Sequence, residues 1–467
     1  MFLERGNKMI KKFFGNKKFY KTLITVTFPI ILSQVIAQFV NLLDNLMVGQ
    51  LSTAELDGVS IANQFFFIFN LAIFGALAGP TIFATQHHGA NNLEGVKECI
   101  RYKWMIGIGI VIVGTIIFFT CDDLIFNFYI HEEELGSVNP LDVIYSGKQY
   151  MRVMLLGLFP FMVGEIYSSN LREAKQTFVP MLANIIAVVV NLVLNYIFIL
   201  GKFGAPALGV VGAAIGTVVS RVICCLIVVI YSMVSKKYQF NKEAFKKFFP
   251  SRKSFVEIFK KTYILLVNEF LWSLGLMLIN NCFSHRGLEV VAAVNISSTF
   301  VNLFALIGTS YGIGLSVILG QQLGAKNFKA AKEDSYKYLA FSIILGFGIA
   351  LIMYALRKTV PMLYDMSMDI ILMSESLIAI TALLIPVRVY STACYFIIRS
   401  GGKLFITFLF DSVFTLCIRV LITYIVVKTT NWSIYYVYFV SEVLEVIKIV
   451  IGTILVKKGI WIQSISK

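Results

Sequence analysis

The sequence predicts an all-α integral membrane protein of twelve transmembrane helices in two pseudo-symmetric bundles of six. Three observations support this prediction. Hydrophobic residues make up 58% of the 467 residues and charged residues only 14%, whereas about a quarter of the residues in soluble domains are charged. The hydrophobic residues gather in runs of about 20 or more, the length that crosses a bilayer as a helix. The two halves of the sequence also resemble each other.

The internal repeat runs through the apolar segments. A stretch that begins at Gln86 recurs at an offset of 235 (321 − 86), and a stretch near Arg172 recurs at an offset of 227 (399 − 172). Two related halves of apolar helices are typical of secondary transporters, whose substrate site lies between the repeats. The repeat therefore indicates transport. It carries Gln86, Gly89, Ala90 and Asn92 onto Gln321, Gly324, Ala325 and Asn327, and it carries Arg172 onto Arg399 and Asn184 onto Asp411.

The first predicted span follows a basic segment at residues 1–21. The apolar run from Thr22 to Val48 is too long for the core of a signal peptide and lacks a small-residue cleavage site, so we expect it to remain as a span. The other spans of the first group are predicted at 57–84, 101–121, 146–170, 177–200 and 208–234, and those of the second group at 262–284, 290–319, 336–357, 370–398, 404–427 and 432–456.

These spans define an N-terminal lobe (22–234), a basic linker (235–261), a C-terminal lobe (262–456) and a tail (457–467). Lysine and arginine are enriched in cytoplasmic loops, so we expect both termini in the cytoplasm and the chain in the plasma membrane. The two halves then run in the same direction. Basic residues on the cytoplasmic side include Lys8, Lys11, Lys12, Lys97 and Lys103, and acidic residues on the opposite side include Glu55, Asp57, Asp122, Glu132, Glu133 and Glu134.

The composition excludes several other classes of function. The net charge of +15 does not indicate nucleic-acid binding, because the basic residues sit in short loops between apolar runs. The seven cysteines show no zinc or disulfide spacing and are expected to be inert thiols. The sequence contains no GxxxxGK[ST] and no HExxH motif, so we expect neither direct use of ATP nor enzymatic activity.

Asp44 is the first candidate for a transport site, because an ionisable residue within a span is costly and often functional. Its span also holds Gln34 and Asn41. It follows Pro29, which can bend the helix. A carboxylate near such a bend can bind a proton or a hard cation. The alternative is that Asp44 sits in water at the outer end of the helix.

Two pairs of polar or small residues mark a second candidate. Asn191 and Asn195 share one helix face at a spacing of i, i+4. Ala213 and Thr217 repeat this spacing on the next span. Amide and hydroxyl oxygens suit a hard cation, and no thiol or imidazole intrudes. The same residue types also form helix–helix hydrogen bonds, so the residues by themselves leave both interpretations open.

Glu269 lies early in the first span of the second half, where the offset of 235 matches it to Gln34 (269 − 34). A carboxyl group among apolar neighbours can carry a proton. The alternative is a permanent ion pair, for which Arg388 in the tenth span is the expected partner. Arg419, Glu165 and Arg221 are further candidates for structural pairing, and Glu442, Glu445 and Lys448 are expected to pair with each other along the last span.

Several stretches together resemble the multidrug and toxic compound extrusion (MATE) transporters over nearly the whole chain. They include "FPIILSQVIAQFVNLLDNLMVGQ" in the first span, "QHHGANN" after the second, and "NEFLWSLG", "GQQLGAKN" and "IIRSGGKLFITFLFD" in the second half. The order and spacing of these stretches make the resemblance specific.

The resemblance implies two six-helix lobes that form a V around a central cavity. It also implies export of amphipathic, often cationic, organic compounds in exchange for Na⁺ or H⁺, with no other cofactor. Asp44 matches the acidic residue of the family's first helix, and Pro29 matches its bending proline. The other side-chain ligands of a cation site match Asn191, Asn195 and Thr217, with the backbone of Ala213 nearby, and Glu269 matches the acidic residue in the seventh helix of the NorM-like branch.

The chain departs from that branch at Arg388. The branch tends to carry an aspartate there, 11 residues before the arginine that matches Arg399. An arginine cannot ligate a cation, so we expect it to neutralise Glu269 and leave the N-terminal lobe alone to couple transport. It also makes the C-terminal cavity less negative, which weakens the expectation of purely cationic substrates. Arg419 is a second departure to which the sequence assigns no role.

The expected mechanism is alternating access by a monomer that binds small organic molecules. Uptake of Na⁺ or H⁺ at Asp44 weakens the hold on the exported compound, and the first helix moves by bending at Pro29. One alternative is a lipid-linked saccharide flippase of the same wider superfamily, which Arg388 and Arg419 favour. Two others are a lipid-modifying membrane enzyme, for which the sequence offers no polar catalytic cluster, and a non-transporting scaffold.

Overall fold

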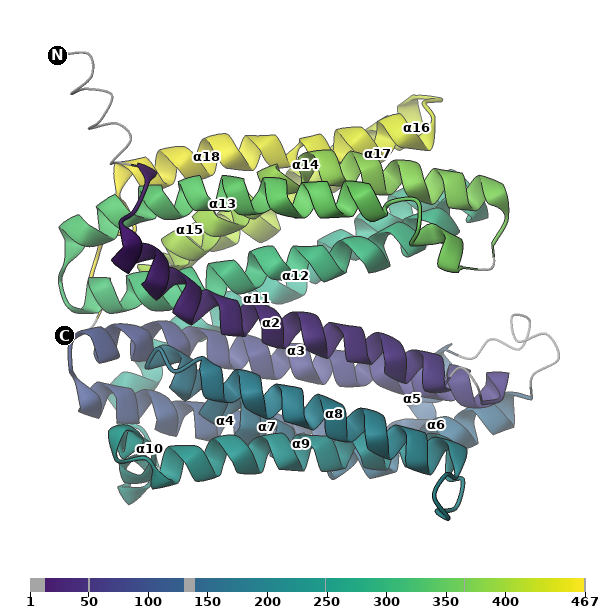
Figure 1. Cartoon of the computed structure of the whole chain (residues 1–467), viewed down its shortest axis with the longest axis horizontal. Coiled ribbons are helices and arrows are strands. Elements are labelled where there is room, and N and C mark those ends of the chain that lie inside the picture. The colour runs from purple at the N-terminus through teal and green to yellow at the C-terminus, as the bar shows by residue number, and fades with distance from the viewer. Residues whose placement is uncertain (1–12, 49–50, 130–138, 248, 365, 466–467) are drawn as a thin grey trace. The chain divides into compact units, whose positions relative to one another are not determined.

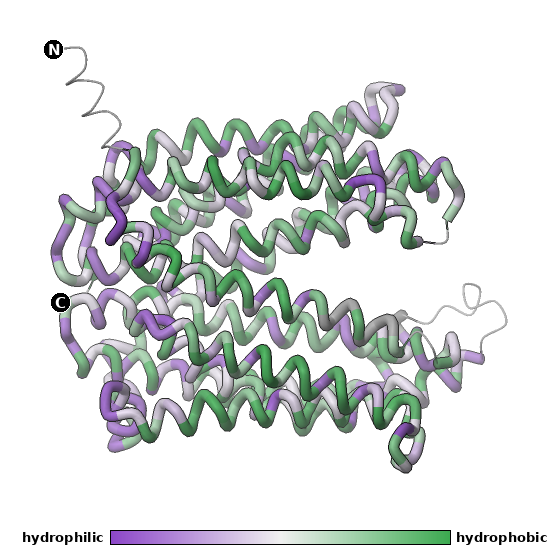
Figure 2. Tube along the Cα trace, viewed as in Figure 1, coloured by the Kyte–Doolittle hydropathy of each residue, from purple (hydrophilic) through white to green (hydrophobic). Residues whose placement is uncertain are grey.

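The computed structural model describes residues 13–48, 51–129, 139–247, 249–364 and 366–465, apart from the side chains of residues 40–42 and 44–46. All regular elements in these ranges are helical (Figure 1), which confirms the all-α fold class. Hydrophobic residues follow the middle of the helices, and hydrophilic residues gather near their ends (Figure 2). The loop residues Lys8, Lys11, Lys12, Glu132, Glu133 and Glu134, on which the predicted orientation partly rests, lie outside these ranges.

Helices occupy all twelve predicted spans. Among the described residues, ten helices are long and apolar enough to cross a membrane, and an eleventh results if α6 and α7 are counted as one bent span. The first half contains α2 (Lys17–Val48), α3 (Thr53–Gly89), α4 (Leu93–Thr120), α5 (Asp122–Tyr129), α6 (Pro140–Leu155), α7 (Leu158–Glu173), α8 (Phe178–Leu200) and α9 (Gly209–Val234). The linker forms η1 (Lys236–Tyr238), α10 (Phe240–Glu243) and η2 (Ala244–Lys246). The second half contains α11 (Arg252–Ser284), α12 (Leu288–Gly324), α13 (Phe328–Leu356), η3 (Pro361–Leu363), α14 (Met368–Ser400), α15 (Leu404–Phe408), η4 (Leu409–Val413), η5 (Thr415–Val420), α16 (Leu421–Thr429), α17 (Ile434–Val443) and α18 (Glu445–Lys458).

Local sequence signals account for several helix ends. Asn139 caps α6 by accepting a hydrogen bond from the backbone N–H of Leu141 at 3.0 Å, and Pro140 occupies the first helical turn, where its missing N–H costs nothing. Gly201 ends α8 with φ of +64°, a conformation that glycine adopts without strain. These signals account for the start of α6 and the end of α8.

Three of the predicted spans are not uniform α-helices. The span at 146–170 is divided into α6 and α7, which meet at a 48° bend. The span at 404–427 contains the π-helical segments η4 and η5. The last span is divided at Leu444 into α17 and α18. π-Helical turns in membrane helices often mark functional positions, and η4 and η5 carry two of the ionisable residues discussed below.

Packing divides the chain into two compact units. Unit 1 comprises Met1–Ile31, Thr85–Asn92 and Tyr263–Lys467, and unit 2 comprises Leu32–Ala84 and Leu93–Thr262. The helices α2, α3 and α11 each contribute residues to both units. The lobe boundaries expected from the sequence stay a prediction.

The repeated motif forms a close helix contact within unit 1. A Cβ atom on Gly89, at the end of α3, would overlap the carbonyl oxygen of Gln321. Reciprocally, a Cβ atom on Gly324, at the end of α12, would overlap the carbonyl oxygen of Gln86. Small residues allow helix backbones in membranes to approach closely. The two copies of the motif therefore pack against each other, and the glycines are required by this contact.

Lys103 is fully buried within α4 rather than exposed near a loop, which corrects the expectation from the sequence. Its Nζ lies 2.5 Å from Oε1 of the equally buried Glu173 on α7. Nζ also donates to Ser169 Oγ and Asn170 Oδ1, each at 2.9 Å. All three donors of the ammonium group are thus satisfied, and the ion pair joins α4 to α7 inside unit 2.

We expect Gly324→Ala to lower the melting temperature of the purified protein, because the added Cβ meets a backbone carbonyl that cannot rotate away. Overpacking of this kind typically costs about 1–3 kcal/mol. The matched control is Gly348→Ala on α13, where a Cβ would have no neighbour within 4 Å. Equal melting temperatures for the two variants in detergent would contradict the close contact.

We expect Lys103→Met to destabilise the protein more strongly, by about 3–5 kcal/mol, because it leaves the Glu173 carboxylate buried without its counter-ion. Adding Glu173→Gln in the same chain should recover most of the lost stability, because the double variant buries no charge there. Thermal unfolding of the two single variants and the double variant measures this coupling. Strictly additive effects of the single changes would show that the pair does not act as a unit.

Candidate functional site

The predicted cation ligands come together on facing sides of α8 and α9 in unit 2. Asn191 and Asn195 lie one turn apart on α8 and are 5% and 1% exposed. Asn191 Nδ2 donates to Thr217 Oγ1 on α9 at 3.4 Å. Ala213 is buried one turn before Thr217. These four positions, three of them buried and Thr217 half-buried, therefore form one patch, here called the α8–α9 patch.

Gly216 allows α9 to pass directly beside Asn195. A Cβ atom at this position would overlap Asn195 Oδ1 and would lie 3.4 Å from the Asn195 backbone nitrogen. The amide oxygen of Asn195 is thus held against the backbone of α9, next to Thr217. Oxygen ligands in fixed positions are what a site for a small hard cation requires.

Asp44 and Pro29 both lie on α2, and their roles stay predictions. The side chain of Asp44 lies outside the described residues. The helix continues through Pro29 without interruption from Lys17 to Val48.

Two contacts fix the direction of α2 relative to α8 within unit 2. Asn184 Nδ2, near the start of α8, donates to Ser33 Oγ on α2 at 2.7 Å. Beyond the other end of α8, a Cβ on Gly209 would lie 2.8 Å from Oε1 of Glu55, which follows α2 in the chain. From Ser33 onward α2 therefore advances in the same direction as α8.

A cavity of about 320 Å³ opens beside the α8–α9 patch. Its walls come from α2, α3, α7, α8 and α9, all within unit 2. Asn191 and Thr217 form part of the wall, together with Asn70, Phe161 and Arg221. Two of the predicted cation ligands, Asn191 and Thr217, thus face the same space as these three side chains.

Two residues with a formal charge line this cavity, and only one of them has an ionic partner within the part of the chain that the structure describes. Glu165 Oε2 lies 3.3 Å from Arg172 Nη2. Arg221 has no carboxylate within 4.0 Å among the described residues, which corrects the expectation of an ion pair. Its Cζ instead lies 4.8 Å from the centroid of the Phe161 ring. The sequence did contain a signal for Arg221, because the offset of 227 (448 − 221) aligns it with Lys448 and places a cation in both halves.

The expected ion pair between Glu269 and Arg388 is not formed in unit 1. Arg388 Nη2 instead donates to both carboxylate oxygens of Glu442 at 3.1 and 3.2 Å. Glu269 Oε1 lies 3.8 Å from Arg399 Nη1. The two arginines are 11 positions apart on α14, which is about three helical turns. Glu269 therefore reaches only the arginine nearer the end of α14.

Glu442 belongs to a buried network in which cations and carboxylates alternate. Arg419 hydrogen-bonds to Glu442 and lies 3.6 Å from Glu445. Lys448 lies 3.6 Å from Glu445, which confirms the expected i, i+3 pair, and 3.0 Å from Asp411. The network comprises three cations and three carboxylates and carries no net formal charge: Arg388, Glu442, Arg419, Glu445, Lys448 and Asp411.

The irregular helices of unit 1 carry this network. Asp411 lies in η4 and Arg419 lies in η5. The division between α17 and α18 falls between Glu442 and Glu445. The breaks in helical periodicity thus coincide with the positions of the charged side chains, and they distinguish these spans from the regular α8 and α9 of unit 2.

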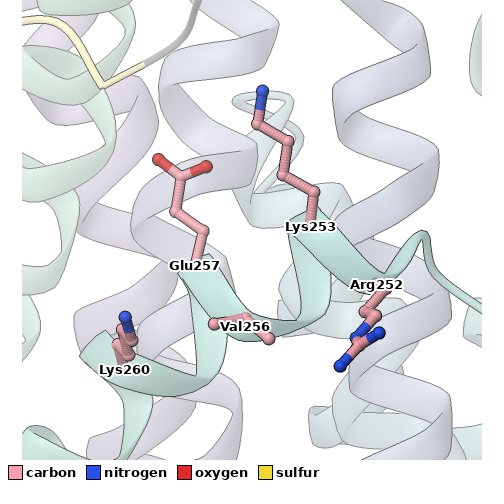
Figure 3. Close-up of a pocket in the computed structure, with 5 residues that line it drawn as sticks. All are labelled: Arg252, Lys253, Val256, Glu257 and Lys260. Atoms are coloured by element: carbon pink, nitrogen blue, oxygen red, sulfur yellow. The ribbon is translucent and has the colours of Figure 1, made fainter.

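A second cavity, of about 600 Å³, lies along the start of α11. Figure 3 shows that its lining residues all come from this one stretch of helix. A depression along a single helix does not enclose a ligand, so the candidate site is the cavity beside the α8–α9 patch. The residues that line this second cavity are Arg252, Lys253, Val256, Glu257 and Lys260.

Known proteins resemble this chain in both sequence and fold. A probable multidrug resistance protein NorM of Bacillus licheniformis is 27% identical over 362 residues, covering 75% of this chain and 76% of the relative. A protein of the same name from Bacillus subtilis (strain 168) is 24% identical over 375 residues, covering 76% and 77% of the two chains. A solved structure described as the outward-facing conformation of a multidrug resistance MATE family transporter of the MOP superfamily matches 94% of this chain and 96% of its own, with a TM-score of 0.82 and 18% identity.

The sequence profile of the MatE family matches residues 29–197 and 265–425, which together make up more than half of the chain and include both halves of the repeat. The apolar helices of this chain cross the membrane several times, as the sequence predicts. The chain therefore belongs to the MatE family and is a membrane transporter, not an enzyme.

Proposed function

We propose that this chain is a secondary active antiporter that exports amphipathic organic compounds in exchange for Na⁺ or H⁺. The names of its relatives support multidrug efflux, since the Bacillus licheniformis protein is called a probable multidrug resistance protein and the alignment covers 76% of it. We further propose that the chain works as a monomer in the plasma membrane, with both termini in the cytoplasm and without ATP.

The observation that carries this proposal is the α8–α9 patch on the wall of a cavity. Asn191 and Thr217 line the cavity, and Asn195 lies behind them against Gly216. Buried amide and hydroxyl groups within apolar helices need polar partners. Their oxygens offer a hard cation such as Na⁺ several ligands, and the cavity gives that cation and an exported compound a common space.

We assign the charged member of this site to Asp44, on the basis of helix register. Asp44 and Asn195 each lie 11 residues beyond the hydrogen bond that joins Ser33 to Asn184. The two helices advance in the same direction, so at a rise of 1.5 Å per residue both positions lie about 16 Å beyond that bond. Asp44 is therefore at the level of Asn195, where a carboxylate would neutralise Na⁺ or accept H⁺.

The charges of unit 1 support a coupling site confined to unit 2. Glu269 already lies beside Arg399, and Asp411 lies beside Lys448. A carboxylate with a fixed cationic partner is a weaker ligand for a transported cation, so Glu269 has at most a secondary role in coupling. Cation uptake at Asp44 weakens the hold of the outward-facing state on the exported compound, and α2 bends at Pro29 during the transition.

We expect Asp44→Asn to abolish ion-driven efflux, because the neutral amide can neither take up H⁺ nor neutralise Na⁺. Efflux of one fluorescent cation, ethidium, and one fluorescent carboxylate, fluorescein, should be followed in energised cells under an imposed Na⁺ gradient and then an imposed H⁺ gradient. Glu269→Gln is the matched control and should retain most of the transport. Unchanged efflux by Asp44→Asn under both gradients would sink the proposed mechanism.

We expect Gly216→Ala to weaken cation coupling without removing any ligand, because the new Cβ displaces Asn195 Oδ1 from its place beside α9. The apparent affinity for the coupling ion should fall about tenfold or more, which corresponds to roughly 1.4 kcal/mol. Transport measured against ion concentration in proteoliposomes reports this affinity. The control is Gly109→Ala on α4, where a Cβ has no neighbour within 4 Å, and an unchanged ion dependence in Gly216→Ala would argue against the α8–α9 patch.

A further inference from the structure

Arg221 is charged and lies inside a membrane helix but, unlike Lys103, has no carboxylate within 4.0 Å among the described residues. It lies at the middle of α9, a 26-residue helix with an apolar sequence, 12 residues after Gly209 and 13 residues before Val234. At 1.5 Å per residue it is about 18 Å or more from both helix ends. An arginine at such a depth is costly unless it is paired or functional.

The side chain of Arg221 contacts an aromatic ring and the bend between two helices. Its Cζ stacks over the Phe161 ring at 4.8 Å, and its stem passes the bend between α6 and α7 at Gly157, where a Cβ would lie 3.4 Å from Arg221 Cδ. The Nη1 atom is buried and has no hydrogen-bond partner among the described residues. The side chain is therefore positioned by apolar contacts, and part of its hydrogen-bonding capacity remains unused.

The charges around the cavity leave Arg221 uncompensated. Glu165 also lines the cavity, but it is engaged with Arg172 at 3.3 Å. The side chains of these three residues together carry one net positive charge. On another wall of the same cavity, Asn70 Oδ1 is buried and has no partner among the described residues. Two residues of the cavity wall, Arg221 and Asn70, thus each hold a buried polar atom, a cationic donor and a neutral acceptor, that has no partner among the described residues.

The second half of the chain shows how carboxylates neutralise a cation at the equivalent position. The offset of 227 aligns Arg221 with Lys448, and it aligns Asn184 with Asp411 (411 − 184). Lys448 is neutralised by Asp411 at 3.0 Å and by Glu445 at 3.6 Å. In the first half the corresponding positions hold no acid: Asn184 replaces Asp411, and Val218 replaces Glu445 (445 − 218 = 227).

Asn184 does not take over this role. Its Nδ2 donates to Ser33 Oγ at 2.7 Å, and its Oδ1 accepts from Cys224 Sγ at 3.1 Å. The repeat therefore retains the cation in both halves while the first half omits the carboxylates that would neutralise it. A carboxylate brought by a ligand would supply what Asp411 supplies to Lys448.

We propose that the cavity of unit 2 binds organic carboxylates that carry an aromatic ring and a hydrogen-bond donor, with Arg221 as the anchor of the carboxylate. Arginine and carboxylate match in geometry and form strong, charge-assisted hydrogen bonds. The ring packs beside Phe161, and the donor reaches Asn70 Oδ1. A cavity of about 320 Å³ lies at the lower end of the range for small-ligand sites. This inference names a substrate class and rests on the proposed export of organic compounds.

The test compares two probes of nearly the same size and shape, indole-3-acetate, which is an anion, and its neutral amide, indole-3-acetamide. Both have an aromatic ring and an N–H donor. Equilibrium binding of each radiolabelled probe to the purified full chain is measured in nanodiscs without any ion gradient. We expect the wild type to bind the acetate at least about tenfold more tightly than the amide, and Arg221→Met to lose this preference. Arg221→Lys should retain part of it, because it keeps the charge.

The matched control is Arg152→Met, which removes an arginine of the same unit whose side chain is 68% exposed. It should leave the preference for the acetate unchanged. The melting temperature of Arg221→Met should equal or exceed that of the wild type, because the variant no longer buries an unpaired charge. Equal affinity of the wild type for both probes, no saturable binding of the acetate, or a preference that survives in Arg221→Met would overturn the inference. None of these results depends on ion-driven efflux, so this inference and the proposed antiport fail independently.

Discussion

The cost of placing an ionised side chain among apolar helices is the constraint on which the rest of this structure depends. A charge without a counter-ion is strongly unfavourable in such surroundings. Unit 2 meets this constraint by enclosing Lys103 with Glu173 and three hydrogen bonds. Unit 1 meets it with an alternating network that ends at Arg388 and Asp411 and carries no net charge. In both units, these ion pairs join the faces of the helices that carry them.

The two halves share one scaffold but use it for different chemistry. The hydrogen bond between Ser33 and Asn184 in unit 2 has a counterpart in unit 1, where Asn268 Nδ2 donates to Asp411 Oδ2 at 3.4 Å. The offset of 235 relates Ser33 to Asn268, and the offset of 227 relates Asn184 to Asp411. In unit 2 these positions are neutral, whereas in unit 1 Asp411 is bound to Lys448. The carboxylates of the network in unit 1 are thus engaged in internal ion pairs, which supports our proposal that the exchanged cation binds in the first half.

The position of Arg221 bears on how binding of a cation and binding of an exported compound would be coupled. A carboxylate anchored at Arg221 and a cation at the α8–α9 patch would share one cavity, and opposite charges attract each other at short range. Direct electrostatic competition therefore does not explain antiport of an anionic compound. In the proposed antiport, the exchange would instead arise from different affinities of the two conformational states for each ligand.

The sequence by itself determined the helical spans, the internal repeat and the residues of the α8–α9 patch, because the length of apolar runs and i, i+4 spacing are local properties. Which charges on different helices meet follows only from the tertiary structure. It paired Arg388 with Glu442 and Glu269 with Arg399, it buried Lys103 with Glu173, and it left Arg221 without a carboxylate partner among the described residues. Pairing between helices depends on the rotation and axial shift of each helix. Those quantities arise from packing across the whole unit and from breaks such as η4 and η5, which no short stretch of sequence encodes.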